Sequence, residues 1–104
     1  MSTYYLSIIS PQGRAFEGQV NSLVAPGAQG SFGILAKHTP YIATLKSGVL
    51  KIVQNGGDKF FALANGVLEV NSKGSVLILS DLAASAKSHE DAEDKIKSAS
   101  ALKK

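Results

Sequence analysis

The chain has 104 residues, which is enough for one domain and too few for two. Its hydrophobic fraction of 44% and charged fraction of 18% are typical of a folded globular protein and argue against disorder over most of its length. The absence of cysteine excludes disulfides, a thiol nucleophile and a cysteine zinc site, and the net charge is a modest +3.

Up to about residue 81 the sequence predicts short β-strands separated by turns that contain glycine. We expect strands at 4–9, 15–24 (as one or two strands), 42–45, 49–54, 60–64, 67–70 and 76–79. Gly18 predicts a bulge or bend, and residues 26–33 are typical of a loop. Residues 76–79 are apolar at every position, so we expect both faces of that strand to be covered. This spacing, without alternating helices, indicates a sandwich or barrel.

Turns that contain asparagine separate the last strands. Asn55-Gly56 is a strong hairpin signal, because a type I′ turn needs two residues with positive φ and this pair adopts them readily. Asn65-Gly66 and residues 71–74 predict two further tight turns.

After Asp81 the sequence changes from strand-like to helix-like. Ser88 followed by Asp91 resembles a capping box, and acids precede lysines as the helix dipole favours. One face of the predicted helix carries Ala92, Ile96, Ala99 and Leu102. Because this apolar stripe is thin, we expect the helix to dock on another surface or to fray. We therefore divide the chain into a β domain at 1–84 and a short helical segment at 85–104.

The glycines of residues 24–40 invite a phosphate-loop interpretation, because three of them are spaced by three. A Walker A loop ends in Gly-Lys-Ser/Thr and a dinucleotide fingerprint needs a following helix, and the sequence shows neither. We assign these glycines to backbone positions with unusual φ or close packing.

The polar residues form no catalytic pattern. His38 has no nearby nucleophile or second ligand, and Ser80-Asp81 has no base placed for it. Nothing in the sequence brings the carboxylates of Glu17 and Glu69 together. We therefore predict no enzymatic activity, no cofactor and no metal site, and we favour an interaction role.

The basic net charge raises nucleic-acid binding as an alternative. Residues 88–104 hold four acids and four lysines, which cancel, and the remaining basic residues are scattered in sequence, as on a solvated surface. Aromatic side chains that could stack on bases are Tyr4, Tyr5, Phe60 and Phe61, but each lies in a strand pattern typical of the core. A small β-barrel-like nucleic-acid-binding module is thus the alternative function.

Five blocks of the sequence, in order and with nearly the family spacing, resemble the epsilon subunit of F-type ATP synthase (delta in mitochondrial naming). The blocks are Ser10-Pro11-Gln12-Gly13 with Phe16-Glu17-Gly18, Pro26-Gly27 with Gly30, Phe32-Gly33-Ile34-Leu35 and His38-Thr39-Pro40, residues 45–50, residues 64–70 and residues 76–81. Because the five blocks are in register and cover about residues 4–86, the resemblance is specific.

The resemblance implies a ten-stranded, two-sheet β-sandwich at the foot of the gamma shaft, in contact with the c-ring and within a complex that contains alpha and beta subunits. The shaft-facing residues would be Ser10, Phe16, His38, Tyr41 and Ile42. The ring-facing residues would be Gly30, Ser31 and Phe32, although many family members have an acid where Ser31 stands. No apolar run approaches the ~20 residues of a membrane span and no signal peptide is visible, so we expect a peripheral location on the cytoplasmic face of a bacterial inner membrane, through partner subunits alone.

The sequence departs from the family pattern at the C-terminus. Full-length members carry two helices, of which the second restrains ATP hydrolysis, and some bind ATP through an Ile/Leu-Asp-x-x-Arg-Ala motif. The corresponding residues 89–94 lack the arginine and the alanine, and residues 88–104 provide for one helix. Either the chain is a naturally short epsilon subunit with little or no inhibitory role, or it is part of a longer protein.

Overall fold

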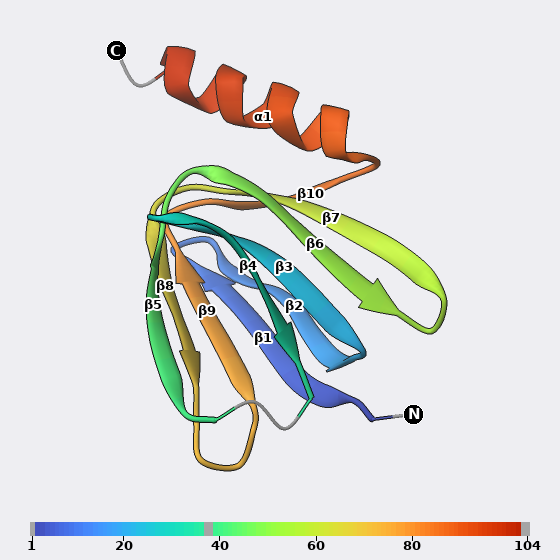
Figure 1. The fold of residues 1–104 in the computed structure, drawn as a ribbon. Helices are drawn as coiled ribbons and strands as arrows, with labels where there is room; N and C mark the ends of the chain where they lie inside the picture. Colours follow the sequence, from blue (N-terminus) through green and yellow to red (C-terminus); the bar gives the residue numbers. More distant parts are fainter. Residues whose placement is uncertain (1, 37–38, 103–104) are drawn as a thin grey trace.

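The computed structural model describes residues 2–36 and 39–102, except for the side chains of 99–102. This part of the chain is mostly β, with a single C-terminal helix, as predicted (Figure 1). The strands are β1 (Tyr4–Ser10), β2 (Gly13–Val20), β3 (Ser22–Gly27), β4 (Gly30–Leu35), β5 (Tyr41–Leu45), β6 (Gly48–Gln54), β7 (Gly57–Leu63), β8 (Gly66–Val70), β9 (Val76–Ser80) and β10 (Ala83–Ala86). The helix is α1 (His89–Leu102).

The strands form two layers that meet at one corner. One layer has the order β4–β3–β6–β7–β10 and the other the order β5–β8–β9–β1–β2. Among the described strands, the two layers are joined by one strand pairing, Gly27–Leu45 between β3 and β5. All described strand pairs are antiparallel except the parallel pair of β1 and β9. The predicted two-sheet sandwich is confirmed.

The core follows the two-residue alternation of the strands. Leu6 and Ile8 of β1 are fully buried, while the residue between them reaches the surface. The largest fully buried side chains are Leu6, Ile8, Val20, Leu23, Ile34, Leu45, Leu50, Ile52, Leu63, Leu68, Val70 and Ile78. They come from both layers, so the core lies between the two sheets.

Residues 26–33 are not the loop that the sequence predicts. They contain the end of β3 and most of β4, joined by a two-residue turn at Ala28 and Gln29. Proline and glycine serve here to make a corner: the Pro26 carbonyl accepts a hydrogen bond from the Lys46 N–H (2.9 Å), and a Cβ on Gly27 would lie 2.7 Å from the Phe32 ring. A second missed strand, β10, consists of alanine and serine and pairs with β7 alone.

Two smaller predictions about the strands are also wrong. The bulge lies in β1–β2 where the register shifts between Ile8 and Ile9, opposite Ala15, whereas Gly18 pairs regularly with Leu6. Strand β9 is covered on one face only, because Val76 and Ile78 are buried whereas Leu79 is 47% exposed. The Asn55-Gly56 turn is confirmed, with φ of 52° and 80°.

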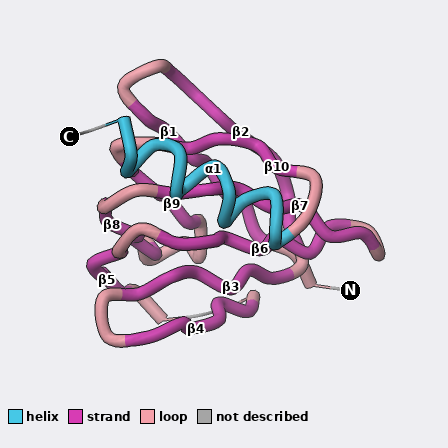
Figure 2. Tube along the Cα trace, turned by 90° about the horizontal axis from the view of Figure 1, so that it is seen from above, coloured by secondary structure: helices cyan, strands magenta, loops and turns pink. Residues whose placement is uncertain are grey.

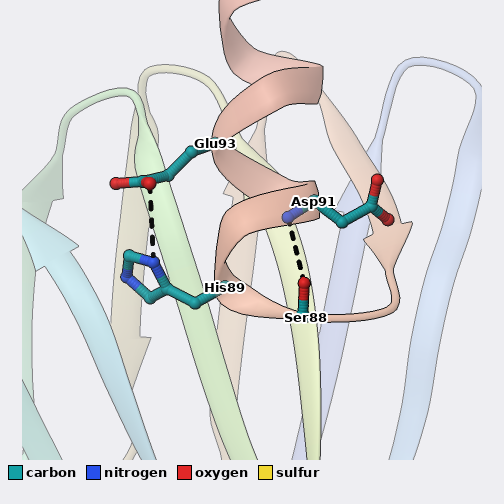
Figure 3. Close-up of polar contacts among 4 residues, drawn as sticks. All are labelled: Ser88, His89, Asp91 and Glu93. Atoms are coloured by element: carbon teal, nitrogen blue, oxygen red, sulfur yellow. Dashed lines mark hydrogen bonds and ion pairs between the residues drawn. The ribbon is translucent and has the colours of Figure 1, made fainter.

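The helix begins as the sequence predicts. The Ser88 hydroxyl accepts a hydrogen bond from the Asp91 N–H (3.1 Å) (Figure 3). The Asp91 carboxylate in turn accepts one from the Lys87 N–H (2.9 Å). The helix packs on β6, β7 and β10, and Figures 1 and 2 show it lying over this part of the sandwich. Ala92 is fully buried and Ile96 half-buried, while the side chains of Ala99 and Leu102 lie outside the described structure.

The Ser80 side chain holds the connection between β9 and β10 in place through hydrogen bonds. Its buried hydroxyl accepts hydrogen bonds from the N–H groups of Ala64 (3.1 Å) and Leu82 (3.3 Å), and it lies within donating distance of the carbonyls of the same two residues (3.0 and 2.6 Å). The Ser80 side chain therefore satisfies backbone groups of Ala64, just after the end of β7, and of Leu82, between β9 and β10.

Replacing Ser80 with alanine is expected to destabilise the fold by about 1–3 kcal/mol, because buried backbone groups lose their partner. The measurement is urea unfolding followed by far-ultraviolet circular dichroism. Ser72→Ala, at an exposed turn position, is the matched control and is expected to change stability by less than about 0.5 kcal/mol. Equal unfolding midpoints for the two variants would show that the Ser80 hydroxyl contributes nothing.

Ser88→Ala is expected to lower the stability of α1 by about 1 kcal/mol, since the first turn loses its cap. Amide hydrogen exchange should then be roughly fivefold faster in the helix and unchanged in the β core. Ser98→Ala, at an exposed mid-helix position, serves as control and should leave helix exchange unchanged or slower. Faster exchange throughout the sandwich in Ser88→Ala would contradict a local role.

Candidate docking surfaces

The outer face of the layer β5–β8–β9–β1 carries an uncovered apolar cluster. Val67 is 42% and Leu79 47% exposed, and these two residues pair across β8 and β9. Ile9 of β1 is the register partner of Leu79 on the other side, and Ile42 of β5 is 70% exposed. We call these four residues the apolar face.

The surroundings of the apolar face resemble the rim of a protein interface. Glu69 pairs with Ile42 across β5 and β8, and beyond β1 the Arg14 guanidinium lies 3.0 Å from the Glu17 carboxylate on β2. Within the apolar face, Leu79 pairs with Val67 and with the half-buried Ile9, whereas Ile42 lies diagonally from Val67, whose partner on β5 is Thr44. Exposed apolar residues bordered by charged side chains are typical of a docking surface. Since α1 packs on the other layer, the helix does not cover this face (Figure 1).

A second concave surface lies where β4 and β5 diverge from the corner. It is a hollow of about 600 Å³ lined by residues 27–32 on one side and by Tyr41, Ala43 and Thr44 on the other. The rings of Phe32 and Tyr41 meet edge to face across it, with centroids 6.0 Å apart and planes at 75°. We call this hollow the β4–β5 notch.

A third hollow, of about 380 Å³, separates α1 from β3 and the β5–β6 turn. Its charged lining mixes Lys46, His89 and Lys97 with Glu93, whose carboxylate lies 3.8 Å from the His89 imidazole (Figure 3). Glu93 thus offsets part of the positive charge that folding gathers here.

The described residues show no metal centre and no membrane span. Within residues 2–36 and 39–102, no group of three or more histidine, aspartate and glutamate side chains is placed to hold a metal ion. No helix of that same part of the chain is long and apolar enough to cross a membrane.

The structure brings together some of the residues that the family resemblance selected. Gly30, Ser31 and Phe32 line the β4–β5 notch, and Tyr41 lines it from the opposite side. Ile42 follows Tyr41 and belongs to the apolar face. The two predicted surfaces therefore meet at the start of β5.

Other selected residues lie apart from this junction. Ser10 follows Ile9 at the end of β1 and donates a hydrogen bond to the Gln12 side chain (3.1 Å). Phe16 is half-buried and packs its ring edge to face on Phe61, with centroids 6.0 Å apart. His38 lies outside the described residues.

The sequence interpretation missed Ile9, Val67 and Leu79. Their only signal was the alternation of buried and exposed positions in β1, β8 and β9, which becomes informative once the pairing of these strands is known.

The aromatic residues considered for base stacking do not form an open platform. Tyr4 and Phe61 belong to the core, and the Tyr4 hydroxyl donates a hydrogen bond to the Ile34 carbonyl (2.7 Å). Burial raises the pKa of Tyr4, so this hydroxyl stays protonated and keeps donating. Tyr5 and Phe60 are half-buried on different layers, in β1 and β7.

Comparison with known proteins shows which family the chain resembles. Residues 3–86 match the family model for the β-sandwich domain of the ATP synthase delta/epsilon chain. The chain is 38% identical over 87 residues to the ATP synthase epsilon chain of Bradyrhizobium sp. (strain ORS 278), which covers 84% of this chain and 64% of that relative. It is 35% identical over 85 residues to the ATP synthase epsilon chain of Rhodopseudomonas palustris (strain BisA53), covering 82% and 62%. The chain thus spans less than two-thirds of the length of these relatives.

Solved structures support the fold. A chain in the cryo-EM structure of the Euglena gracilis mitochondrial ATP synthase (OSCP/F1/c-ring) superimposes with a TM-score of 0.77 at 21% identity, over 97% of this chain and 66% of that one. A chain in the central stalk/c-ring structure of the Tetrahymena thermophila mitochondrial ATP synthase gives a TM-score of 0.65 at 16% identity, over 76% and 63%. At these identities the likeness concerns the fold alone.

Proposed function

The chain belongs to the ATP synthase delta/epsilon family, and we propose that it is a non-catalytic subunit of the central stalk of a proton- or sodium-translocating ATP synthase, linking the gamma shaft to the c-ring. In this role it would couple ion flow to ATP synthesis. Its partners would be gamma and the c-ring, within a complex that also contains alpha and beta subunits. The chain would be peripheral on the cytoplasmic face of a bacterial inner membrane, held there by these subunits.

The observation that carries this proposal is the apolar face. Ile42, Val67 and Leu79 keep between 42% and 70% of their surface exposed on a layer that the protein's own helix leaves uncovered. Burying such side chains stabilises a complex by about 25 cal/mol per Å² of apolar surface, before the costs of association. We assign the apolar face to the gamma shaft.

The residues selected from the family resemblance differ in how well their positions fit the proposed contacts. Tyr41 and Ile42 lie at or beside the apolar face and Ser10 follows Ile9, so all three fit a shaft contact. Phe16 contributes mainly to the core through Phe61, and for it and for His38 a shaft contact stays a prediction. Gly30, Ser31 and Phe32 are assigned to the c-ring contact.

A body between shaft and ring has to transmit force without deforming. The sandwich suits this task, because its interior is close-packed and resists changes in volume. The two proposed contacts approach each other at Tyr41 and Ile42, so the path from one partner to the other through β5 is short.

We propose in addition that this 104-residue chain has little or no inhibitory effect on ATP hydrolysis. Its helix is 14 residues long and packs on β6, β7 and β10. At the positions of the family's nucleotide motif, acidic Glu93 and Asp94 replace arginine and alanine. Both features support coupling without regulation by a nucleotide bound there.

Leu79→Lys is expected to weaken binding of the chain to purified gamma by about tenfold or more, because the complex would then bury a charge where it otherwise buries an apolar side chain. Isothermal titration calorimetry measures the affinity, and circular dichroism verifies folding. Leu35→Lys is the matched control, since Leu35 is 68% exposed on β4 of the other layer. Equal weakening by both variants, or by neither, would contradict the assignment of the apolar face.

Adding the chain back to ATP synthase that lacks its native epsilon subunit should restore ion-driven ATP synthesis and leave the hydrolysis rate uninhibited. Synthesis and hydrolysis are measured on the same inverted membrane vesicles. The Leu79→Lys variant should restore synthesis less well than the Leu35→Lys control. Strong inhibition of hydrolysis by the chain would refute the second proposal, and failure to restore synthesis would refute the first.

A further inference from the structure

The sequence contains the dipeptide Asn-Gly twice, and the two copies lie in different structural settings. Asn55-Gly56 forms the turn of the β6–β7 hairpin, at the edge of the molecule (Figure 1). Asn65-Gly66 lies where β7 leads into β8. Both asparagine side chains are exposed, so exposure alone does not distinguish the two sites.

An asparagine followed by glycine can react with its own backbone in water. The glycine nitrogen forms a bond to the carbonyl carbon of the asparagine side chain, and the bond from that carbon to the amide nitrogen breaks. Ammonia leaves with the proton that the glycine nitrogen has lost, and a five-membered succinimide remains. Water then opens the ring at either carbonyl, which gives aspartate or isoaspartate. Glycine favours the reaction because it has no side chain to hinder the approach of its nitrogen.

Ring closure requires the peptide between asparagine and glycine to rotate towards the asparagine side chain. In a hydrogen-bonded turn this rotation means that the turn opens locally. The rate in the folded protein therefore follows the population of the open form, which differs between segments of one structure.

Few contacts hold the Asn55-Gly56 turn closed. The Asn55 N–H donates a hydrogen bond to the Asn21 side-chain oxygen (2.9 Å), and Gln54 pairs with Gly57 at the base of the turn. Space around the missing Cβ of Gly56 is open, which leaves room for the peptide to rotate. Opening here involves only the end of a hairpin.

The surrounding sheet holds the Asn65-Gly66 peptide on several sides. The Asn65 carbonyl accepts a hydrogen bond from the Asp81 N–H (3.1 Å). Gly66 pairs with Leu45 on β5 and with Ser80 on β9, and a Cβ on it would clash with the backbone of β9. This peptide rotates only if β8 separates from a neighbouring strand, which is a larger opening than that of a hairpin end.

We propose that Asn55 is a site of spontaneous deamidation in the folded chain, and that the fold protects Asn65, which is followed by the same residue. The reaction converts an uncharged turn residue into a carboxylate and lowers the net charge from +3 by one. In the isoaspartate form the backbone runs through the former side chain and gains one carbon, so the two-residue turn no longer matches the register of β6 and β7. This inference does not depend on the proposed function.

The experiment incubates the full, folded chain at mildly alkaline pH and, in parallel, the same chain unfolded in urea. Peptide mapping by mass spectrometry measures deamidation at each asparagine, and chromatography separates the aspartate and isoaspartate peptides. In the folded chain Asn55 should react about tenfold or more faster than Asn65, and isoaspartate should accompany aspartate at Asn55. In urea the two rates should agree within about twofold, because glycine follows both residues.

Two variants test whether the contacts around each site set these rates. Asn21→Ala removes the acceptor of the Asn55 N–H, and should raise the rate at Asn55 about two- to tenfold without effect at Asn65. Ser80→Ala removes the hydroxyl that binds the Ala64 backbone beside Asn65, and should raise the rate at Asn65 alone. Each variant is thus the control for the other, and circular dichroism verifies that both are folded.

Equal rates at the two sites in the folded chain, or a faster reaction at Asn65, would overturn the inference. Aspartate at Asn55 without isoaspartate would also overturn it, because the amide would then be hydrolysed directly and not through the succinimide. If Asn55 reacts in urea and stays intact in the folded chain, the hairpin turn protects it and the inference is wrong.

Discussion

The architecture depends on the close approach of backbones at the corner where the two layers meet. Gly27 pairs with both Gly30 of β4 and Leu45 of β5, and among the described strands this is the one strand pairing that joins the two layers. A Cβ at Gly27 would lie 2.6 Å from the Gly30 carbonyl, and one at Gly48 would lie 2.5 Å from the Pro26 ring. Because β4 and β5 diverge from this corner, the molecule has a notch between them.

The two outer faces of the sandwich differ because only one of them is covered. Helix α1 packs on β6, β7 and β10, and its Ala92 is fully buried. The opposite layer has no such cover, so the outward positions of β8 and β9 keep their apolar side chains exposed. Exposed apolar side chains occur on both layers, at Val24 and Leu35 on one and at Ile42, Val67 and Leu79 on the other. Of these residues only Val67 and Leu79 pair directly across neighbouring strands, and the proposed contact is therefore assigned to their face.

Strands could be predicted from the sequence wherever apolar alternation and turn residues agreed. The hairpin at Asn55-Gly56 and the helix cap at Ser88 depend on interactions within four residues, so a local pattern contains all that is needed. The corner at 26–33 could not be predicted, because its proline and glycines have the composition of a loop and act through contacts with Lys46 and Phe32. Strand β10 was missed for a related reason: its alanines have weak strand preference, and pairing with β7 makes them a strand.

The candidate surfaces illustrate the same limit. Family resemblance selected Tyr41, Ile42 and Phe32, yet it could not show that Tyr41 and Phe32 face each other across one notch. A continuous apolar run at 76–79 suggested a strand buried on both sides, whereas the structure buries one side and leaves Leu79 exposed beside Val67 and Ile9. The difference between the strand prediction and the structure at Leu79 is therefore informative, because the exposed, core-like pattern there is the observation on which the proposed shaft contact rests.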